Sequence, residues 1–320
     1  MSAALPTARL GRTDVEVTTF GLGTAPLGGL FEPVSDAAAA STIAAAWDGG
    51  VRFFDTAPWY GFGRAERRVG DGLRGRAGAT LATKVGRLLV ASDDPPGPEN
   101  GWPDPLPFAP IHDYGYDAVH RSFEDSLQRL GLARIDVLFV HDIGRMTHED
   151  GHERHFDDAM DGGLRALTEL RAAGRIGAIG IGVNEIEVLL RAMDRADWDV
   201  FLLAGRYTLL EQGALDELLP ACERSGTSVV VGGAFNSGLL AGGSTWNYSE
   251  APAELVARRD RLAQIAREHD VALEAAALRF PLAHPAVPSV LVGCRSEREV
   301  RANLAHFAAE IPRVFWEALT

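Results

Sequence analysis

The stretch VRFFDTAPWY, at residues 51–60, joins a short apolar run to a group of ionisable and aromatic side chains. Its first half, residues 52–55, has the length and the apolar content of a buried β-strand. Asp55 ends this strand, and Tyr60 follows five residues later in a loop short enough to bring the phenol back over the strand end. The stretch therefore predicts a strand whose carboxyl end carries groups with a chemical role.

Similar short strands alternate with amphipathic helical patterns from about residue 19 to about residue 308. The helical patterns, at residues 35–50, 116–132, 162–177 and 214–226, each end near a glycine that can supply the C-cap. Alternation of this kind closes most simply as a parallel (β/α)8 barrel, the TIM-barrel class of α/β fold. We expect residues 1–320 to form one such domain, with eight strands at residues 19–23, 52–55, 80–84, 135–141, 178–183, 200–204, 228–231 and 289–292.

Composition limits the possible partners. The formal net charge of −13 argues against general affinity for nucleic acid or anionic lipid, since both need a positively charged surface. No stretch approaches the roughly 18 uninterrupted apolar residues of a membrane span, and the start MSAALPTARLGRTD lacks the pattern of a signal peptide. We therefore expect a cytoplasmic protein that binds a small molecule, in which Cys222 and Cys294 are buried core residues.

The segment ASDDPPGPENGWPDPLPFAPIHDYG, at residues 91–115, is rich in proline and glycine. This composition argues against a helix or a central strand. The segment follows the third expected strand, so in a barrel it emerges at the end where active sites form. We expect residues 86–115 to form a long loop that acts as a lid over the substrate, with a variable surface loop as the alternative.

Three ionisable residues end neighbouring strands: Asp55 the second, Lys84 the third and His141 the fourth. They are expected to point into one barrel mouth, together with Tyr60. The motifs FDTAPWYG, LATKVG, GLARIDVL and DVLFVHD that carry them resemble those of the aldo-keto reductases. The resemblance extends over nearly the whole chain and is greatest to the branch that contains L-fucose dehydrogenase, D-threo-aldose 1-dehydrogenase and pyridoxal 4-dehydrogenase.

These four residues suit hydride transfer between a carbinol carbon and nicotinamide. The reaction moves one proton at the oxygen, and Tyr60 can carry it if an adjacent ammonium, Lys84, favours the phenolate. Asp55 would keep the lysine charged and oriented, and His141 would hydrogen-bond the substrate oxygen. The resemblance implies the same four roles. A nucleophilic role for Lys84, as in an aldolase, is disfavoured because pairing with Asp55 keeps the amine charged.

The chain lacks a complete Rossmann fingerprint, so no motif of that kind predicts cofactor binding. Cofactor binding is instead implied by the resemblance. A nicotinamide dinucleotide would lie across the mouth, with Thr24 and Asp55 near the ribose and Asn184 at the carboxamide. The segment VGCRSEREVRANL at residues 292–304 would hold the adenosine. In that segment Gly293 and Glu299 replace the cations of NADPH-preferring members, so we expect NAD, with NADP as the alternative if Arg295 or Arg298 binds a phosphate. The expected contacts of the adenosine half are Gly293, Arg295, Glu299 and Asn303.

The resemblance to this branch implies that the substrate is an aldose in its lactol form, L-fucose or D-arabinose, oxidised at C1 to a lactone. Aromatic faces suit a sugar ring, and polar side chains can meet its hydroxyls. The residues expected to contact the substrate are Trp59, Trp102, His112, Asn236 and Trp246. Oxidation of pyridoxal and general NADPH-dependent aldehyde reduction are the enzymatic alternatives. A protein that senses nicotinamide nucleotide without turnover is the non-enzymatic one.

The histidine-rich segment after the fourth expected strand also suggests a metal site. His148, His152 and His155 have helical spacing that can gather a metal ion. We expect instead a solvated acidic loop, because the segment lacks an apolar face to shield a metal and the mechanism needs none.

Overall fold

The computed structural model describes residues 4–97, 100–247 and 249–319 and confirms the expected barrel. Its parallel strands follow one another in chain order around the barrel, and the last pairs with the first. Each expected strand is present, with ends shifted by at most a residue or two. The barrel strands are β3 (Phe20–Gly23), β4 (Phe53–Asp55), β5 (Thr80–Val85), β8 (Val137–His141), β9 (Ala178–Val183), β10 (Val200–Ala204), β11 (Ser228–Gly232) and β14 (Val290–Gly293).

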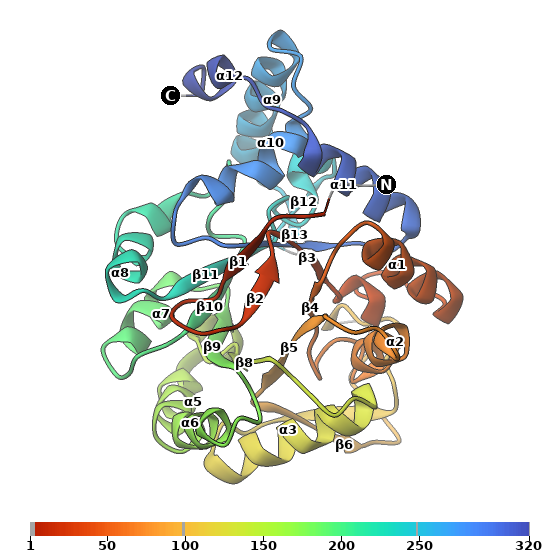
Figure 1. The fold of residues 1–320 in the computed structure, drawn as a ribbon, viewed down its shortest axis with the longest axis vertical. Coiled ribbons are helices and arrows are strands. Elements are labelled where there is room, and N and C mark those ends of the chain that lie inside the picture. The colour runs from red at the N-terminus through yellow and green to blue at the C-terminus, as the bar shows by residue number, and fades with distance from the viewer. Residues whose placement is uncertain (1–3, 98–99, 248, 320) are drawn as a thin grey trace.

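Helices surround the barrel (Figure 1). They are α1 (Asp36–Asp48), α2 (Arg64–Leu73), α3 (Tyr116–Leu130), α4 (Arg145–His148), α5 (His152–Asp158), α6 (Leu164–Ala172), α7 (Ile186–Met193), α8 (Leu218–Ser225), α9 (Ala253–Glu268), α10 (Leu273–Arg279), α11 (Glu297–Ala308) and α12 (Arg313–Glu317). Ser35 caps α1 by accepting a hydrogen bond from the Ala38 amide, and Gly131 and Gly226 end α3 and α8 in the left-handed conformation. Among the described residues, no helix is long and apolar enough to cross a membrane.

The interior of the barrel is packed with side chains and closed at one end. Alternate strand residues point inward, and Phe53, Ala82, Val137 and Phe139 belong to this interior cluster. The hairpin of β1 (Thr7–Arg9) and β2 (Glu16–Thr18) lies across the amino-terminal end of the barrel strands (Figure 1), and residues of the hairpin join the same cluster. The opposite end, at the carboxyl ends of the strands, is therefore the mouth.

The expected loop at residues 86–115 contains regular structure. Two antiparallel strands, β6 (Arg87–Ala91) and β7 (Phe108–His112), form a hairpin separate from the barrel sheet. Pro110 lies within β7, which is compatible with a strand in a two-stranded ribbon because one edge needs no amide donor. The segment lies outside the barrel sheet, as its prolines predicted. It is not the long loop that we expected, because part of it forms a hairpin.

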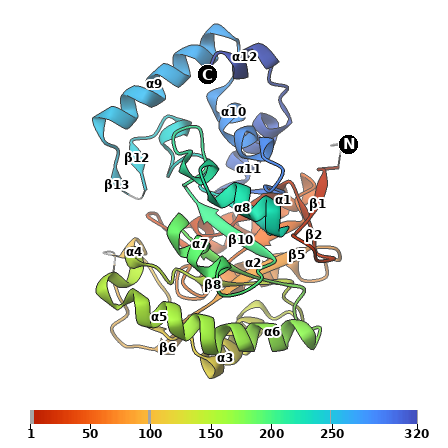
Figure 2. The same ribbon diagram turned by 90° about the vertical axis from the view of Figure 1, so that its left-hand side faces the viewer.

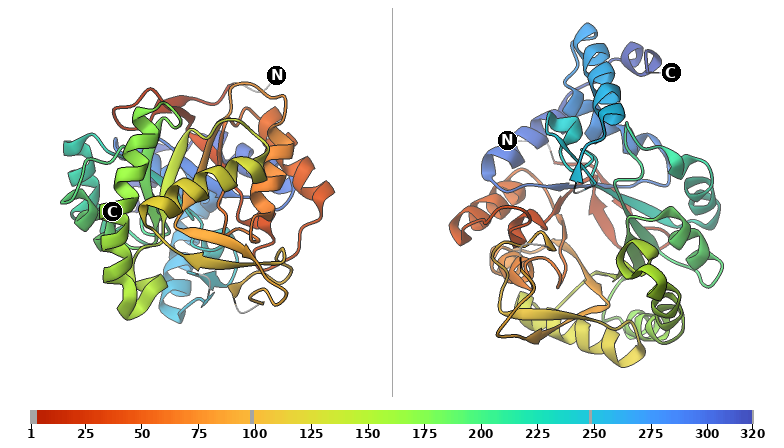
Figure 3. Two further views of the ribbon diagram at one scale, coloured as in Figure 1. Left: turned by 90° about the horizontal axis from the view of Figure 1, so that it is seen from below. Right: turned by 180° about the vertical axis from the view of Figure 1, so that it is seen from behind.

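A second excursion follows β11 and carries the short strands β12 (Thr245–Trp246) and β13 (Ser249–Glu250). Beyond it, α9, α10 and α12 form a lobe at one side of the barrel with its own apolar cluster (Figure 2). Seen from behind, the orange β6–β7 segment and the pale blue β12–β13 segment lie on the side of the barrel opposite β1 and β2 (Figure 3). Both excursions therefore belong to the mouth side.

Candidate active site

The alternation of the strands places three ionisable side chains at the mouth. Asp55 is two residues beyond the inward-facing Phe53, and Lys84 two beyond Ala82, so both face the barrel interior one layer above the apolar cluster. His141 continues Val137 and Phe139 in the same way on β8. Because β4, β5 and β8 are neighbours in the sheet, the three side chains converge.

Asp55 and Lys84 form a sealed ion pair. The ammonium of Lys84 donates to Asp55 Oδ1 at 2.8 Å and Oδ2 at 2.7 Å, and to the carbonyl of Thr56 at 2.9 Å. Their side chains are 1% and 4% exposed for the lysine and the aspartate. Burial raises the pKa of Asp55 above its usual value, and the charge of Lys84 opposes that rise. The contact geometry matches a charged lysine held in one orientation.

Tyr60 and His141 lie over this pair. Lys84 Nζ is 4.7 Å from the centroid of the Tyr60 ring, and the Tyr60 and His141 rings meet edge to face with centroids 6.0 Å apart. Burial, followed by the charges of Arg87 and Lys84, lowers the pKa of His141 well below its usual value. His141 is therefore neutral near pH 7 and can donate one hydrogen bond to an oxygen atom.

A cavity of about 530 Å³ opens above these groups. Tyr60, Lys84 and His141 line it, and so do three of the residues predicted to contact the substrate, Trp59, Trp102 and His112. Trp59 and Trp102 meet edge to face with ring centroids 6.2 Å apart, forming an aromatic wall. Trp102 comes from the β6–β7 connection, so the segment expected to act as a lid supplies part of this wall.

Of the residues expected at the nicotinamide, Thr24 is buried and Asn184 lines the cavity. Thr24 is buried, and its hydroxyl donates to the Asp55 carbonyl at 2.9 Å, so it fixes the end of β4. Asn184 lines the cavity and donates through Nδ2 to the Ala204 carbonyl at 3.1 Å. Asn184 is therefore presented to the cavity, whereas Thr24 supports its floor.

The residues expected at the adenosine lie together between β14 and α11. Glu299 accepts a hydrogen bond from the Arg295 amide at 2.8 Å, and Asn303 Nδ2 lies 3.4 Å from Cys294 Sγ. Gly293 is exposed at the end of β14. The segment thus gathers the four predicted residues at one strand end.

Two features of this strand end fit a dinucleotide. A Cβ atom on Gly293 would lie only 3.0 Å from Pro26 Cγ, so glycine keeps a narrow space open there. Arg295 Nε is a buried donor without a hydrogen-bond partner among the described residues. Glu32 Oε2 lies 4.0 Å from this nitrogen, beyond hydrogen-bonding distance, so the guanidinium can still donate to a phosphate-bearing ligand.

Two residues expected to contact the substrate are placed elsewhere. Asn236 is buried, where it accepts a hydrogen bond from the Thr208 hydroxyl at 2.6 Å and lies outside the residues that line the cavity. Trp246 lies in β12 and packs against the apolar cluster of the α9–α12 lobe. In this conformation neither side chain borders the cavity.

Two histidines of the histidine-rich segment, His148 and His155, lie together beside the mouth. The rings of His148 and His155 have centroids 4.0 Å apart, and His148 Nε2 lies 2.8 Å from the Tyr114 hydroxyl. His152 instead contacts Glu153, with Nε2 3.1 Å from Oε1. Among the described residues, no group of three or more histidine, cysteine or carboxylate side chains has an arrangement that holds a metal ion.

The residues that line the cavity without having been predicted from the sequence include an ion pair, Arg87 and Asp142. Arg87 Nη2 donates to Asp142 Oδ2 at 2.7 Å, and the guanidinium carbon lies 4.5 Å from the Trp59 ring centroid. Asp142 directly follows His141, and Arg87 begins β6. The position of Asp142 immediately after a strand-end histidine was the available signal.

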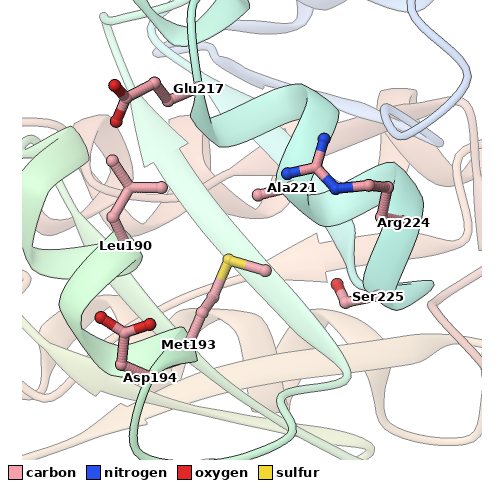
Figure 4. A pocket seen from close by; sticks show the side chains of 7 residues that line it. All are labelled: Leu190, Met193, Asp194, Glu217, Ala221, Arg224 and Ser225. Carbon is pink, nitrogen blue, oxygen red and sulfur yellow. The ribbon is translucent and has the colours of Figure 1, made fainter.

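A separate cavity of about 560 Å³ lies between α7 and α8 (Figure 4). Leu190 and Met193 of α7 face Ala221 of α8, and the charged Asp194, Glu217 and Arg224 lie at its exposed rim. It contains none of the predicted residues. We therefore place the active site at the mouth of the barrel.

Comparison with known proteins identifies the family. The model of the aldo/keto reductase family matches residues 19–320. The chain belongs to this family. It is 50% identical to pyridoxal 4-dehydrogenase of Microbacterium luteolum, over 97% of this chain and 95% of that protein. It is 39% identical to D-threo-aldose 1-dehydrogenase of a Pseudomonas species, over 100% of this chain and 97% of that one.

A solved structure shares the architecture. The glycerol dehydrogenase of Gluconobacter oxydans superposes with a TM-score of 0.75 at 25% identity, covering 98% of this chain and 93% of its own. The branch expected from the sequence motifs is confirmed by the two relatives. This aldo-keto reductase is accordingly an NAD(P)-dependent oxidoreductase that acts on a small aldehyde or sugar.

Proposed function

We propose that this aldo-keto reductase oxidises a cyclic hemiacetal to a lactone with NAD. The observation that carries the proposal is the position of the Lys84 ammonium, which lies 4.7 Å from the centre of the Tyr60 ring and is held by Asp55, while the His141 ring meets the same tyrosine edge to face. A charged lysine beside a phenol favours the phenolate, the form that can accept a proton from a hydroxyl.

The residues divide the chemistry between them. Tyr60, as phenolate, takes the proton of the hemiacetal hydroxyl, and Lys84 stabilises the charged form of the phenol. His141, neutral and buried, donates a hydrogen bond to the reacting oxygen. Bound NAD would supply the hydride acceptor, so that the carbon loses a hydride, the oxygen loses a proton, and a lactone and NADH result. Asp55 orients the lysine.

Asn184 would hold the carboxamide of the cofactor, and Gly293, Arg295 and Asn303 would hold its adenosine half. Glu299 lies where a 2′-phosphate would meet a carboxylate, according to the family resemblance, and this favours NAD over NADP. The β6–β7 segment, which supplies Trp102, would cover the bound substrate.

Pyridoxal is our first candidate substrate, and the aldoses L-fucose and D-arabinose are the second. Identity of 50% to a pyridoxal 4-dehydrogenase, against 39% to a D-threo-aldose 1-dehydrogenase, supports this order. Pyridoxal closes to an internal hemiacetal, so both classes present the same reacting group. The aromatic wall of Trp59 and Trp102 suits either a pyridine ring or the C–H face of a sugar.

The test is a comparison of kcat/KM for pyridoxal, L-fucose and D-arabinose with NAD, with the products identified by NMR. We expect lactones and the highest value for pyridoxal. A sugar value above that of pyridoxal would reverse the order of substrates. If open-chain aldehydes are reduced with NADPH faster than any hemiacetal is oxidised, general aldehyde reduction replaces the proposal.

A further inference from the structure

Asp142 places a carboxylate at the mouth, beside the histidine that meets the reacting oxygen. Its Oδ2 atom lies 3.3 Å from His141 Nε2 and accepts a hydrogen bond from Arg87 Nη2 at 2.7 Å. The side chain is 21% exposed and lines the cavity, so a ligand can reach it.

The backbone of Asp142 is fixed in an unusual conformation. Its φ of 49° lies in the left-handed region, which is sparsely populated by residues other than glycine. The amide donates to the Gly182 carbonyl at 2.9 Å, and the carbonyl accepts from the Tyr114 hydroxyl at 3.2 Å. Backbone strain that the surrounding structure holds in place is concentrated at functional sites. Here the strained turn directs a carboxylate to the cavity rather than away from it.

Arg87 favours the ionised form of this carboxylate. The guanidinium is buried against the Trp59 ring and holds Asp142 Oδ2. Burial raises the pKa of Asp142, and the charges of Arg87 and then Lys84 oppose the rise. The arginine thereby favours the ionised form, which can only accept hydrogen bonds.

The distance between the donor atom of His141 and the acceptor atom of Asp142 is similar to the distance between two neighbouring hydroxyl oxygens in the candidate substrates. Both candidate classes carry a second hydroxyl close to the reacting one, at C2 of an aldose and at C3 of the pyridine ring. Two such oxygens lie roughly 3 Å apart, a hydrogen-bonding separation. The 3.3 Å between His141 Nε2 and Asp142 Oδ2 is similar. An oxygen at His141 therefore brings its neighbouring hydroxyl to Asp142.

We propose that Asp142 is a specificity residue, which accepts a hydrogen bond from the hydroxyl adjacent to the reacting hydroxyl while His141 contacts the reacting oxygen. This inference rests on the proposed function, since it assumes that the substrate is a hydroxylated hemiacetal. Asp142 thereby selects substrates of both classes over analogues that lack the second hydroxyl, because such analogues leave its carboxylate without a hydrogen bond from the substrate.

The test crosses two enzymes with two pairs of substrates. Wild type and Asp142→Ala are assayed with NAD on L-fucose and its 2-deoxy analogue, and on pyridoxal and its 3-deoxy analogue. We expect wild type to prefer the hydroxylated member by roughly 10- to 100-fold in kcat/KM, as for a hydrogen bond to a charged group. In Asp142→Ala we expect that preference to fall below about threefold, because the acceptor is gone.

Two further variants sharpen the test. Asp142→Asn keeps an acceptor oxygen and is expected to retain part of the preference. Asp93→Ala removes an exposed carboxylate from the β6–β7 connection and is expected to leave the preference unchanged. Thermal unfolding of each variant checks that the barrel is intact.

The failures are distinguishable. If Asp142→Ala lowers kcat/KM equally for both members of each pair, the carboxylate only positions His141, and this inference is overturned while the proposed function stands. If wild type oxidises none of the four compounds with NAD, the proposed function fails and the inference fails with it.

Discussion

Two ion pairs lie at the mouth of the barrel, and they differ in exposure. Lys84 and Asp55 are 1% and 4% exposed, and three hydrogen bonds hold the ammonium. Arg87 and Asp142 are 5% and 21% exposed, and one hydrogen bond joins them. The first pair is sealed under the cavity floor, whereas the carboxylate of the second reaches the cavity.

The difference separates two tasks. A charge that has to act on a neighbouring phenol benefits from burial, since low polarity strengthens its effect. A carboxylate that has to meet a ligand needs an accessible oxygen and a partner that holds the rest of it. In the proposed function, the Lys84 pair supports the chemistry, and the Arg87 pair supports recognition of the substrate.

Removal of each cation should expose this contrast in stability. Lys84→Met leaves Asp55 buried without its partner and is expected to lower the free energy of unfolding by about 3–5 kcal/mol. Arg87→Met leaves Asp142 near the cavity, where water can solvate it, and should cost about 1–2 kcal/mol. Denaturant unfolding near pH 7 measures both. Equal losses in the free energy of unfolding would mean that the two carboxylates are equally shielded from water, contrary to this comparison.

Substitution of the tyrosine beside each pair should affect kcat unequally, with the larger loss beside the Lys84 pair. Tyr60→Phe removes the proton carrier and should lower kcat by about 100-fold or more, with little change in cofactor affinity. Tyr114, whose hydroxyl donates to the His141 carbonyl at 2.8 Å, is the control. Tyr114→Phe should lower kcat by less than about tenfold, since it removes only neutral hydrogen bonds, to the carbonyls of His141 and Asp142 and to the His148 ring. Retention of more than half of the activity by Tyr60→Phe would refute the assignment.

A third carboxylate, Glu299, extends the comparison to the cofactor. Wild type is expected to favour NAD over NADP in kcat/KM. Glu299→Gln should shift this ratio toward NADP by about tenfold, because it removes a charge that repels the 2′-phosphate, and Glu299→Arg should shift it further. Glutamine retains an oxygen for the Arg295 amide, so it is the matched variant. A wild-type preference for NADP would indicate that Arg295 or Arg298 binds the phosphate.

The smallest effect concerns the histidines beside the more exposed pair. Burial, with neighbouring His155, lowers the pKa of His148 to about 4, and burial also lowers the pKa of His141 well below its usual value. The unfolded chain takes up these protons below about pH 6.5 and the folded chain does not, so the free energy of unfolding should fall between about pH 6.5 and 4.

Paired unfolding curves at about pH 7 and pH 5 measure this slope. His148→Gln should make the fall shallower, and His306→Gln, on α11, should leave it unchanged. An equally steep fall in His148→Gln would show that other groups account for the pH dependence.

The fold and the positions of Asp55, Lys84 and His141 were predictable from strand periodicity, and the resemblance of their motifs to the aldo-keto reductases indicated their roles together with that of Tyr60. Once Phe53 and Ala82 are inside the barrel, Asp55 and Lys84 must point into the mouth. The placement of Tyr60 followed from a loop too short to lead elsewhere. These inferences need no knowledge of side-chain packing.

Residues in turns and long connections were harder to predict. The direction of Asp142 depends on a positive φ, and nothing in the sequence requires that conformation of an aspartate. Asn236 also has a positive φ, 48°, and turns inward to Thr208 rather than to the cavity. The β6–β7 hairpin was hidden because its prolines lie in a two-stranded ribbon, where they remain compatible with pairing.

The most direct test of the proposed reaction follows the hydrogen on the hemiacetal carbon. Pyridoxal deuterated at its aldehyde carbon is incubated with the enzyme and NAD, and both products are analysed by NMR and mass spectrometry. The account predicts that the deuterium appears at C4 of the reduced nicotinamide and that the organic product is the lactone. Turnover that leaves deuterium on the organic product, or releases it to water, would contradict hydride transfer from the lactol.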